Sequence, residues 1–237
     1  EEYLLEKIPE LRIIRMDSDT TSRKGSYEKL LTQFKDNKAD LLLGTQMISK
    51  GLDFPNITLV GVLSIDGLMA IPSFKANEKL FQLLVQTAGR AGRSDKEGEV
   101  VFQTNISSNI IDYAIKQSYP DFYKYEINRR KLINYPPFCK ISFITIKGYN
   151  ETKVEYAAKA IYNFLKEKNN KLDILGPNRN AFYKINNEYK FNIVIKYQEE
   201  EYKTLYPLLK YINNYFAESF STEKITITID NFAQDYI

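Results

Sequence analysis

The chain has no histidine and a single cysteine, Cys139, among its 237 residues. A structural zinc site takes about four Cys or His ligands, so this composition excludes one within the chain. One cysteine cannot form an internal disulfide, which is compatible with a reducing compartment. The sequence contains no run of about 18 apolar residues and no signal-peptide pattern. We therefore expect a cytoplasmic protein that does not bind a membrane.

Two nucleotide-binding signatures are also missing. No G-x-x-x-x-G-K-[ST] phosphate loop occurs, and no D-E-x-[DH] acidic box follows a candidate strand. Phosphoryl transfer depends on groups that position the phosphates and on a metal ion. We therefore expect the chain alone to be inactive as a nucleoside triphosphatase. The net charge of +3 is compatible with nucleic-acid binding but is too small to argue for it.

The most informative segment that is present is the octet QTAGRAGR at residues 86–93, which ends a predicted helix. Its two glycines allow the backbone to approach another surface closely, because glycine has no side chain. Arg90 and Arg93 would then project planar, permanently charged guanidinium groups that are suited to phosphate. The alternative interpretation is a solvated basic helix end.

A second informative segment, residues 44–62, follows the apolar residues 41–43 and runs into the apolar residues 57–65. Both apolar stretches are short and bounded by turn residues, which predicts buried strands. Thr45 and Gln46 would then follow the end of a strand, where ligands bind in open parallel α/β sheets.

The loop that follows contains Gly51 and Asp53, so a backbone turn and a carboxylate could meet a ribose hydroxyl there. Taken alone, this loop is better explained as a simple turn before the next strand. The arginine octet in the same chain favours a nucleotide site instead.

The two segments together resemble motifs V and VI of superfamily 2 helicases, and most closely those of the primosomal protein N′ family of bacterial replication-restart DNA helicases. Residues 44–62 resemble motif V, and residues 86–93 resemble motif VI. Residues 17–25 resemble the start of the second motor lobe of that family. Residues 135–138 and 175–177 resemble the beginning of its C-terminal domain and a loop inside that domain, so the resemblance spans nearly the whole chain.

The resemblance assigns roles to individual residues. It implies that Arg90 and Arg93 are catalytic residues that contact the γ-phosphate of ATP. It implies an ATP-binding role for four residues, namely Gly51, Asp53, Gln86 and Gly89. It implies DNA contacts by three further residues, namely Thr20, Thr45 and Gln46. Leu52 stands where the family often has histidine, but the glycine and aspartate beside it are unaltered.

The resemblance also implies cofactors and partners outside the chain. ATP with magnesium would be bound mainly by a first motor lobe preceding Glu1, and zinc would bind a cysteine cluster there, so we expect the C-terminal half of a larger protein. Forked and single-stranded DNA, the single-strand-binding protein and other primosome components are the expected partners. Two alternatives stay open. One is a non-catalytic DNA-branch or protein-docking module, and the other is a related recombination-fork helicase, whose motif V does not continue as residues 54–60 do.

The order of predicted elements gives an α/β fold in two domains. Strands alternating with helices predict a RecA-like second helicase lobe, a parallel sheet flanked by helices, with a helical connector at its end, over residues 1–134. The order β-α-β-β-α-β predicts a smaller ferredoxin-like α+β domain over residues 135–237. Lysines and aromatic residues interleave there in three pairs, namely Tyr183-Lys184, Tyr189-Lys190 and Lys196-Tyr197. This pattern permits either nucleic-acid binding or a solvated sheet face.

Overall fold

The computed structural model describes residues 1–17, 19–21, 25–45, 54, 56–71, 73–89 and 98–233. They form two compact units, of which the first comprises Glu1–Asp66 and Leu80–Ser118, and the second comprises Gly67–Lys79 and Tyr119–Ile237. The second unit therefore includes a segment that lies between the two parts of the first unit in the sequence. The expected division into independent domains at residue 134 stays a prediction.

The first unit contains two parallel strand pairs. Its elements are α1 (Glu2–Lys7), β1 (Ile13–Met16), α2 (Ser26–Lys35), β2 (Leu41–Gly44), β3 (Leu59–Val62), the start of α3 (Asp66–Met69), most of α4 (Ala76–Ala88), β4 (Glu99–Phe102) and α5 (Asn109–Ile115). The strand β1 pairs in parallel with β2, and β3 pairs in parallel with β4. A helix separates the strands of each pair in sequence, as parallel pairing requires. Parallel strands separated by helices agree with the expected α/β lobe.

The helix α2 packs on the first strand pair through the apolar stripe that the sequence contains. Tyr27, Leu30, Leu31 and Phe34 lie against the buried side chains of Ile14, Met16 and Ala39. The spacing i, i+3, i+4, i+7 puts the four stripe residues on one helix face, as in an amphipathic helix.

The strand β3 is more exposed than the sequence predicted. Its exposure alternates along the chain, and the side chains of Leu59 and Leu63 are 61% and 70% exposed. Alternation is the pattern of a strand that is covered on one face, because successive side chains point to opposite faces. The expectation of a fully buried strand at residues 57–65 is therefore wrong for the described residues.

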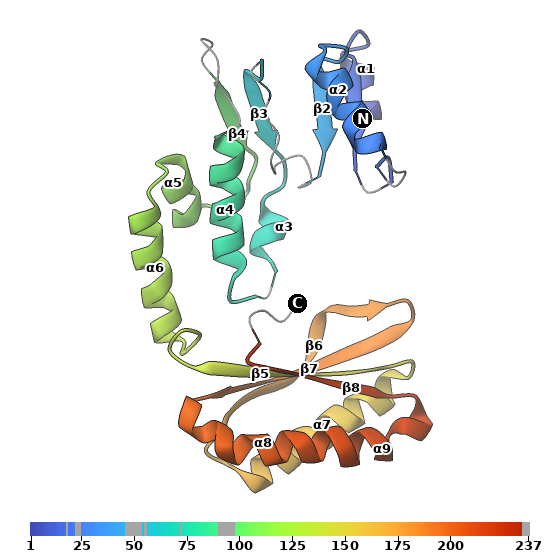
Figure 1. Ribbon diagram of the computed structural model, residues 1–237, viewed down its shortest axis with the longest axis vertical. Coiled ribbons are helices and arrows are strands. Elements are labelled where there is room, and N and C mark those ends of the chain that lie inside the picture. The colour runs from blue at the N-terminus through green and yellow to red at the C-terminus, as the bar shows by residue number, and fades with distance from the viewer. Residues whose placement is uncertain are drawn as a thin grey trace. The chain divides into compact units, whose positions relative to one another are not determined.

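The second unit is a layer of antiparallel sheet covered by helices. Its elements are α6 (Tyr119–Leu132), β5 (Lys140–Gly148), α7 (Glu151–Lys168), β6 (Asp173–Ile185), β7 (Glu188–Tyr197), η2 (Glu199–Glu201), α8 (Tyr202–Tyr211), the π-helical η3 (Ile212–Phe216), α9 (Ala217–Ser219), η4 (Ser221–Glu223) and β8 (Thr226–Asn231). The sheet order is β6-β7-β5-β8, with every neighbouring pair antiparallel. Figure 1 shows α7 and α8 on one face of this sheet. This arrangement agrees with the predicted ferredoxin-like order.

Both faces of this sheet are buried near the start of β5. Ile144 and Ile146 face the helices and join the main core of the unit. Ile141 and Phe143 point to the opposite face, where they form a second cluster with Phe74. Phe74 comes from the segment before α4, which explains why that segment belongs to the second unit.

The strand β6 is one continuous element with an irregular pairing to β7. Its pairing with β7 is shifted between Leu175 and Asn178 and again between Arg179 and Lys184. Gly176 lies at the first shift with φ of +107°, and a Cβ there would come within 2.6 Å of the Asn192 carbonyl oxygen. Only glycine fits this position, so an apparent strand break is an irregularity inside a continuous strand.

Candidate functional site

The described DNA-binding candidates follow two strands that end side by side. Met16 at the end of β1 pairs with Gly44 at the end of β2. Thr20 lies in the turn after β1, and Thr45 follows β2 directly with its side chain exposed. The carboxyl ends of parallel strands lie at the same edge of a sheet, so both threonines lie just beyond the same edge of this strand pair. The expected position of Thr45 just past a strand end is confirmed.

The turn after β1 is held by Asp17, to which sequence reasoning gave no role. The amides of Asp19 and Thr20 donate to its carboxylate at 3.1 and 2.9 Å, and Arg15 also donates to it. The Thr20 amide, and to a smaller extent the Arg15 guanidinium, lower the pKa of Asp17 despite partial desolvation. The Thr20 hydroxyl accepts from the Asp17 amide and donates to the Asp17 carbonyl. The hydroxyl is therefore used within the turn, which leaves the rigid turn itself as the feature that could meet a phosphate.

The two described ATP-site candidates lie in and after the last turn of α4. Leu80, Leu84 and Thr87 form the buried face of this helix, whereas Gln86 and Gly89 are exposed. A Cβ at Gly89 would have ordinary contacts of 3.6 and 3.7 Å with backbone oxygens. The fold of the described residues therefore accepts a side chain there, and any need for glycine comes from a surface that approaches it.

The remaining candidates lie outside the described residues. This applies to Gln46, Gly51 and Asp53 in the first segment and to Arg90 and Arg93 in the octet. Their roles stay predictions from the sequence.

In the second unit, the β6–β7 hairpin places cations on aromatic rings. The Lys184 amine lies 4.9 Å from the centre of the Tyr189 ring, and the Arg179 guanidinium lies 4.5 Å from the centre of the Tyr183 ring. The two tyrosine rings meet edge to face at 5.6 Å. The hairpin thus combines cations with aromatic surface, a combination used by proteins that bind single-stranded nucleic acid, although Arg179 is also paired with Glu151 at 2.9 Å.

Lys196 and Tyr197 do not belong to that surface. Tyr197 is 2% exposed and lies in the main core, and Lys196 is 7% exposed. The Lys196 amine donates to the Ile133 carbonyl at 3.0 Å and forms an ion pair with Asp173 at 3.6 Å. The interpretation of this pair as part of a nucleic-acid face is wrong, because both side chains are engaged inside the unit.

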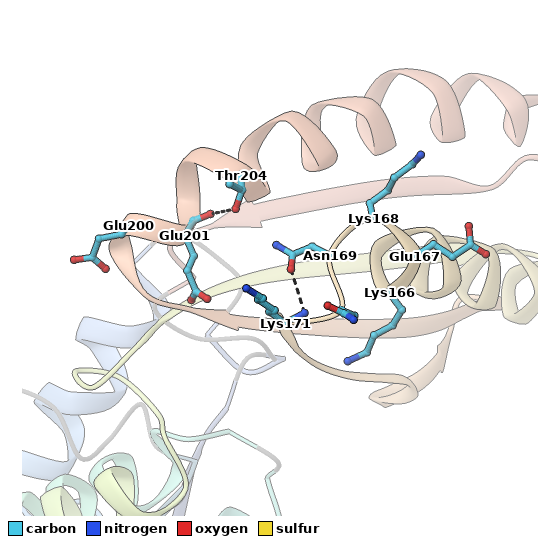
Figure 2. A pocket seen from close by; sticks show the side chains of 9 residues that line it. Lys166, Glu167, Lys168, Asn169, Lys171, Glu200, Glu201 and Thr204 are labelled. Atoms are coloured by element: carbon cyan, nitrogen blue, oxygen red, sulfur yellow. Dashed lines mark hydrogen bonds between the residues drawn. The ribbon is translucent and has the colours of Figure 1, made fainter.

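A hollow of about 670 Å³ lies between the end of α7 and the start of α8 (Figure 2). Its rim carries both signs of charge, with Lys168 and Lys171 near Glu200 and Glu201. The Glu201 carboxylate accepts from the Gln198 amide, which caps the helix turn that follows. Mixed charge and local capping indicate a solvated surface depression here, and they give no reason to assign a ligand to it.

Two wider searches covered the described ranges only. Among these residues no group of three or more Cys, Asp or Glu side chains is placed to hold a metal ion. The helices described are also all too short or too polar to cross a bilayer.

The comparison with known protein families identifies the class of protein. The family model of the helicase conserved C-terminal domain matches residues 1–95, so this part is the C-terminal domain of a helicase. The model of the primosomal protein N C-terminal domain matches residues 131–232. A solved structure of the C-terminal domain of the DEAD-box protein Dbp5 matches 54% of this chain and 73% of that chain, with 18% identity and a TM-score of 0.36.

The curated relatives name the family. Replication restart protein PriA of Bacillus subtilis is 44% identical over 97% of this chain and 29% of its own length. The Synechocystis protein of the same name is 40% identical over 83% of this chain and 24% of its own length. The Haemophilus influenzae protein of that name is 32% identical over 97% of this chain and 32% of its own length. The chain belongs to the PriA replication restart family and spans less than a third of these relatives.

Proposed function

We propose that this chain is the C-terminal part of an ATP-dependent DNA helicase that restarts stalled replication forks. The single observation that carries the proposal is that one chain matches a helicase C-terminal domain followed by the PriA-specific C-terminal domain. A recombination-fork helicase would account for the first match without the second. The bacterial cytoplasm is the compartment in which this activity would operate.

In this proposal the first unit completes a composite nucleotide site. Arg90 and Arg93 stabilise the charge that develops on the γ-phosphate, because a guanidinium placed on developing charge helps the transition state more than the ground state. Gly51 and Asp53 contact the nucleotide near its ribose. The helix α4 supports the proposal, because its buried face fixes the direction in which the chain enters the arginine octet.

Gln86 and Gly89 act beside the arginines. The exposed Gln86 side chain is available for a hydrogen bond with the nucleotide, and Gly89 allows the opposing surface to approach closely. The tolerance for a Cβ at Gly89 within the described fold supports this role, since folding alone does not require glycine there.

The strand-end turns connect the nucleotide site to DNA. Thr45 and Gln46 after β2 contact a DNA phosphate through backbone amides and side chains, and the turn that contains Thr20 after β1 contributes to the same DNA contact. The parallel register of Met16 and Gly44 supports a joint role, because it brings both turns to one edge.

The groups absent from this chain come from the preceding part of the protein. A magnesium–ATP complex supplies the transferable phosphoryl group, and the first lobe holds it through a phosphate loop, a metal ligand and a catalytic base. Zinc does not fit this chain, whose only cysteine is the buried Cys139, and would bind elsewhere in the full protein.

The second unit binds the branched or single-stranded DNA on which the motor acts, and primosome components such as the single-strand-binding protein dock on the same protein. The cation–aromatic pairs of the β6–β7 hairpin support a DNA contact. A non-catalytic DNA-branch module remains the alternative, and the same hairpin favours it if the arginine octet proves dispensable.

Steady-state ATP hydrolysis tests the proposal. The full-length protein is expected to hydrolyse ATP in a DNA-stimulated manner, and the present chain alone is expected to have no turnover. DNA-stimulated turnover by the purified chain, with contaminating ATPases excluded, would refute the composite site. An inactive full-length protein that still binds forked DNA would favour the non-catalytic module.

A further inference from the structure

The carboxylate of Glu126, on α6, is the centre of a buried polar network in the second unit. Glu126 is 3% exposed. Arg129 donates to both of its oxygens at 2.9 and 2.7 Å, and Arg130 donates to one at 2.9 Å. The side-chain amide of Asn77 donates to the other at 2.9 Å. Four hydrogen bonds from three side chains therefore fix this carboxylate in position.

The arginines of this network also bind the segment that leads into α4. The carbonyl of Phe74 accepts from Arg129 at 3.2 Å and from Arg130 at 3.3 Å. Arg130 forms an ion pair with Glu78 at 2.9 Å, and its guanidinium lies 5.1 Å from the centre of the Phe74 ring. Arg130 thus holds both the approach to α4 and its first turn.

The same arginine reaches the connection between α6 and β5. Arg130 donates to the carbonyl of Pro136 at 3.2 Å. Phe74 packs on Ile141 and Phe143 of β5, and its ring lies 5.7 Å from that of Tyr135. The beginning of α4 is therefore attached to the sheet of the second unit by polar and apolar contacts together.

The helix α4 leads from this attachment to the arginine octet. Asn77 and Glu78 lie in its first turn, within the second unit, whereas residues 80–88 belong to the first unit. The helix is continuous to Ala88, so about 16 Å of regular helix separates the attachment from its last residue. The octet begins inside this helix at Gln86, and Arg90 follows two residues after its end.

The main effect of such a buried ionic network is to fix how the packed segments are arranged, and its contribution to the free energy of folding is small. Two carboxylates and two guanidinium groups balance in charge, and a buried ionic cluster is often no more stable than an apolar one of the same volume. Its directional hydrogen bonds fit one position of the first turn of α4 on α6. An apolar contact would tolerate sliding or rotation of the helix.

We propose that Asn77 and Glu78 are positioning residues that hold the start of α4 on the Glu126–Arg130 network and thereby couple the second unit to the arginine motif. The inference rests on the proposed function. When the second unit engages DNA, the attached helix links that event to the segment of the sequence that carries the arginine motif. Without the attachment, both units keep their folds and their ligands, but DNA no longer stimulates hydrolysis fully.

The test uses the full-length protein with the double substitution Asn77→Ala and Glu78→Ala. This variant removes both polar contacts of the α4 first turn but leaves Glu126 bonded to Arg129 and Arg130, so no unpaired buried charge is created. The matched control is Gln82→Ala, an exposed position on the same helix. The measurements are ATP turnover and KM with and without single-stranded DNA, DNA affinity, and thermal unfolding.

We expect the ratio of DNA-stimulated to basal turnover to fall about tenfold in the double variant. We expect three quantities to stay within twofold of the Gln82→Ala control, namely the KM for ATP, the basal turnover and the DNA affinity. The unfolding temperature is expected to stay within a few degrees of that control. A folded double variant with normal stimulation would overturn the inference. If the double variant does not fold, the two single variants are measured instead. Normal DNA stimulation in both single variants would also overturn the inference. A wild-type protein without DNA-stimulated turnover would instead contradict the proposed function.

Discussion

The amine of Lys196 lies 4.2 Å from the centre of the Tyr135 ring, so a buried lysine of β7 joins the sheet to the connection between α6 and β5. The same amine donates to the Ile133 carbonyl. We expect Lys196→Ala to lower the free energy of unfolding of the second unit by about 2 kcal/mol, because a charged hydrogen bond and a cation–π contact are lost together. Urea unfolding monitored by circular dichroism measures this.

Lys203→Ala, at an exposed position of α8, is the control and is expected to change stability by less than about 0.5 kcal/mol. Equal stability of both variants would contradict the structural role of Lys196.

The charge of Glu126 predicts how stability depends on pH. Burial disfavours the carboxylate, but hydrogen bonds from Arg129, Arg130 and Asn77 outweigh it and lower the pKa of Glu126. The stabilising contribution is therefore complete above the unfolded-state pKa of about 4.3 and is lost as the pH falls through the lower folded-state value. The stability difference between wild type and Glu126→Gln should be largest near pH 7 and shrink in acid. Unfolding temperatures from pH 7 to pH 3 test this, and a constant difference across the range would contradict it.

Two glycines should respond differently to the same substitution. Gly176→Ala is expected to destabilise the second unit by about 2 kcal/mol or more, because the backbone has a positive φ and the new Cβ meets the Asn192 carbonyl. Gly89→Ala should leave stability nearly unchanged, since its Cβ has only ordinary contacts.

The activities of the same two variants complete this prediction. In the full-length protein, Gly89→Ala should lower ATP turnover at least tenfold if another surface approaches that glycine. Thermal unfolding and ATP hydrolysis measured on both variants separate the two roles. A stable Gly89→Ala protein with normal turnover would remove Gly89 from the proposed nucleotide site.

Local patterns predicted much of this fold, because the residues that determine each element are close in sequence. The apolar stripe from Tyr27 to Phe34 has the spacing of an amphipathic helix and forms α2, and Ile and Thr alternate at residues 225–229, as they do in the strand β8 (Thr226–Asn231). The strand end before Thr45 could also be found, since an apolar run stops there.

The features that were missed depend on contacts between distant segments. The burial of Lys196 requires Ile133 and Tyr135, which come from another part of the chain. The attachment of Phe74 to β5 joins residues far apart in sequence, and no periodicity signals it. Glu126, Arg129 and Arg130 do have the i, i+3, i+4 spacing of helical ion pairs. That spacing is also typical of solvated helices, so their burial could not be inferred from it.

The most direct test of the central claim is ATP turnover by full-length protein carrying Arg90→Ala, Arg93→Ala or both, with saturating single-stranded DNA. The proposed role predicts that turnover falls by about 10³ to 10⁵, equivalent to roughly 4 to 7 kcal/mol of barrier, while nucleotide affinity changes much less. Lysine substitutions should rescue poorly, because a point charge cannot replace the planar guanidinium. Circular dichroism confirms that each variant is folded. A folded double variant whose turnover stays within a few-fold of wild type would contradict the claim that this chain completes the ATP site.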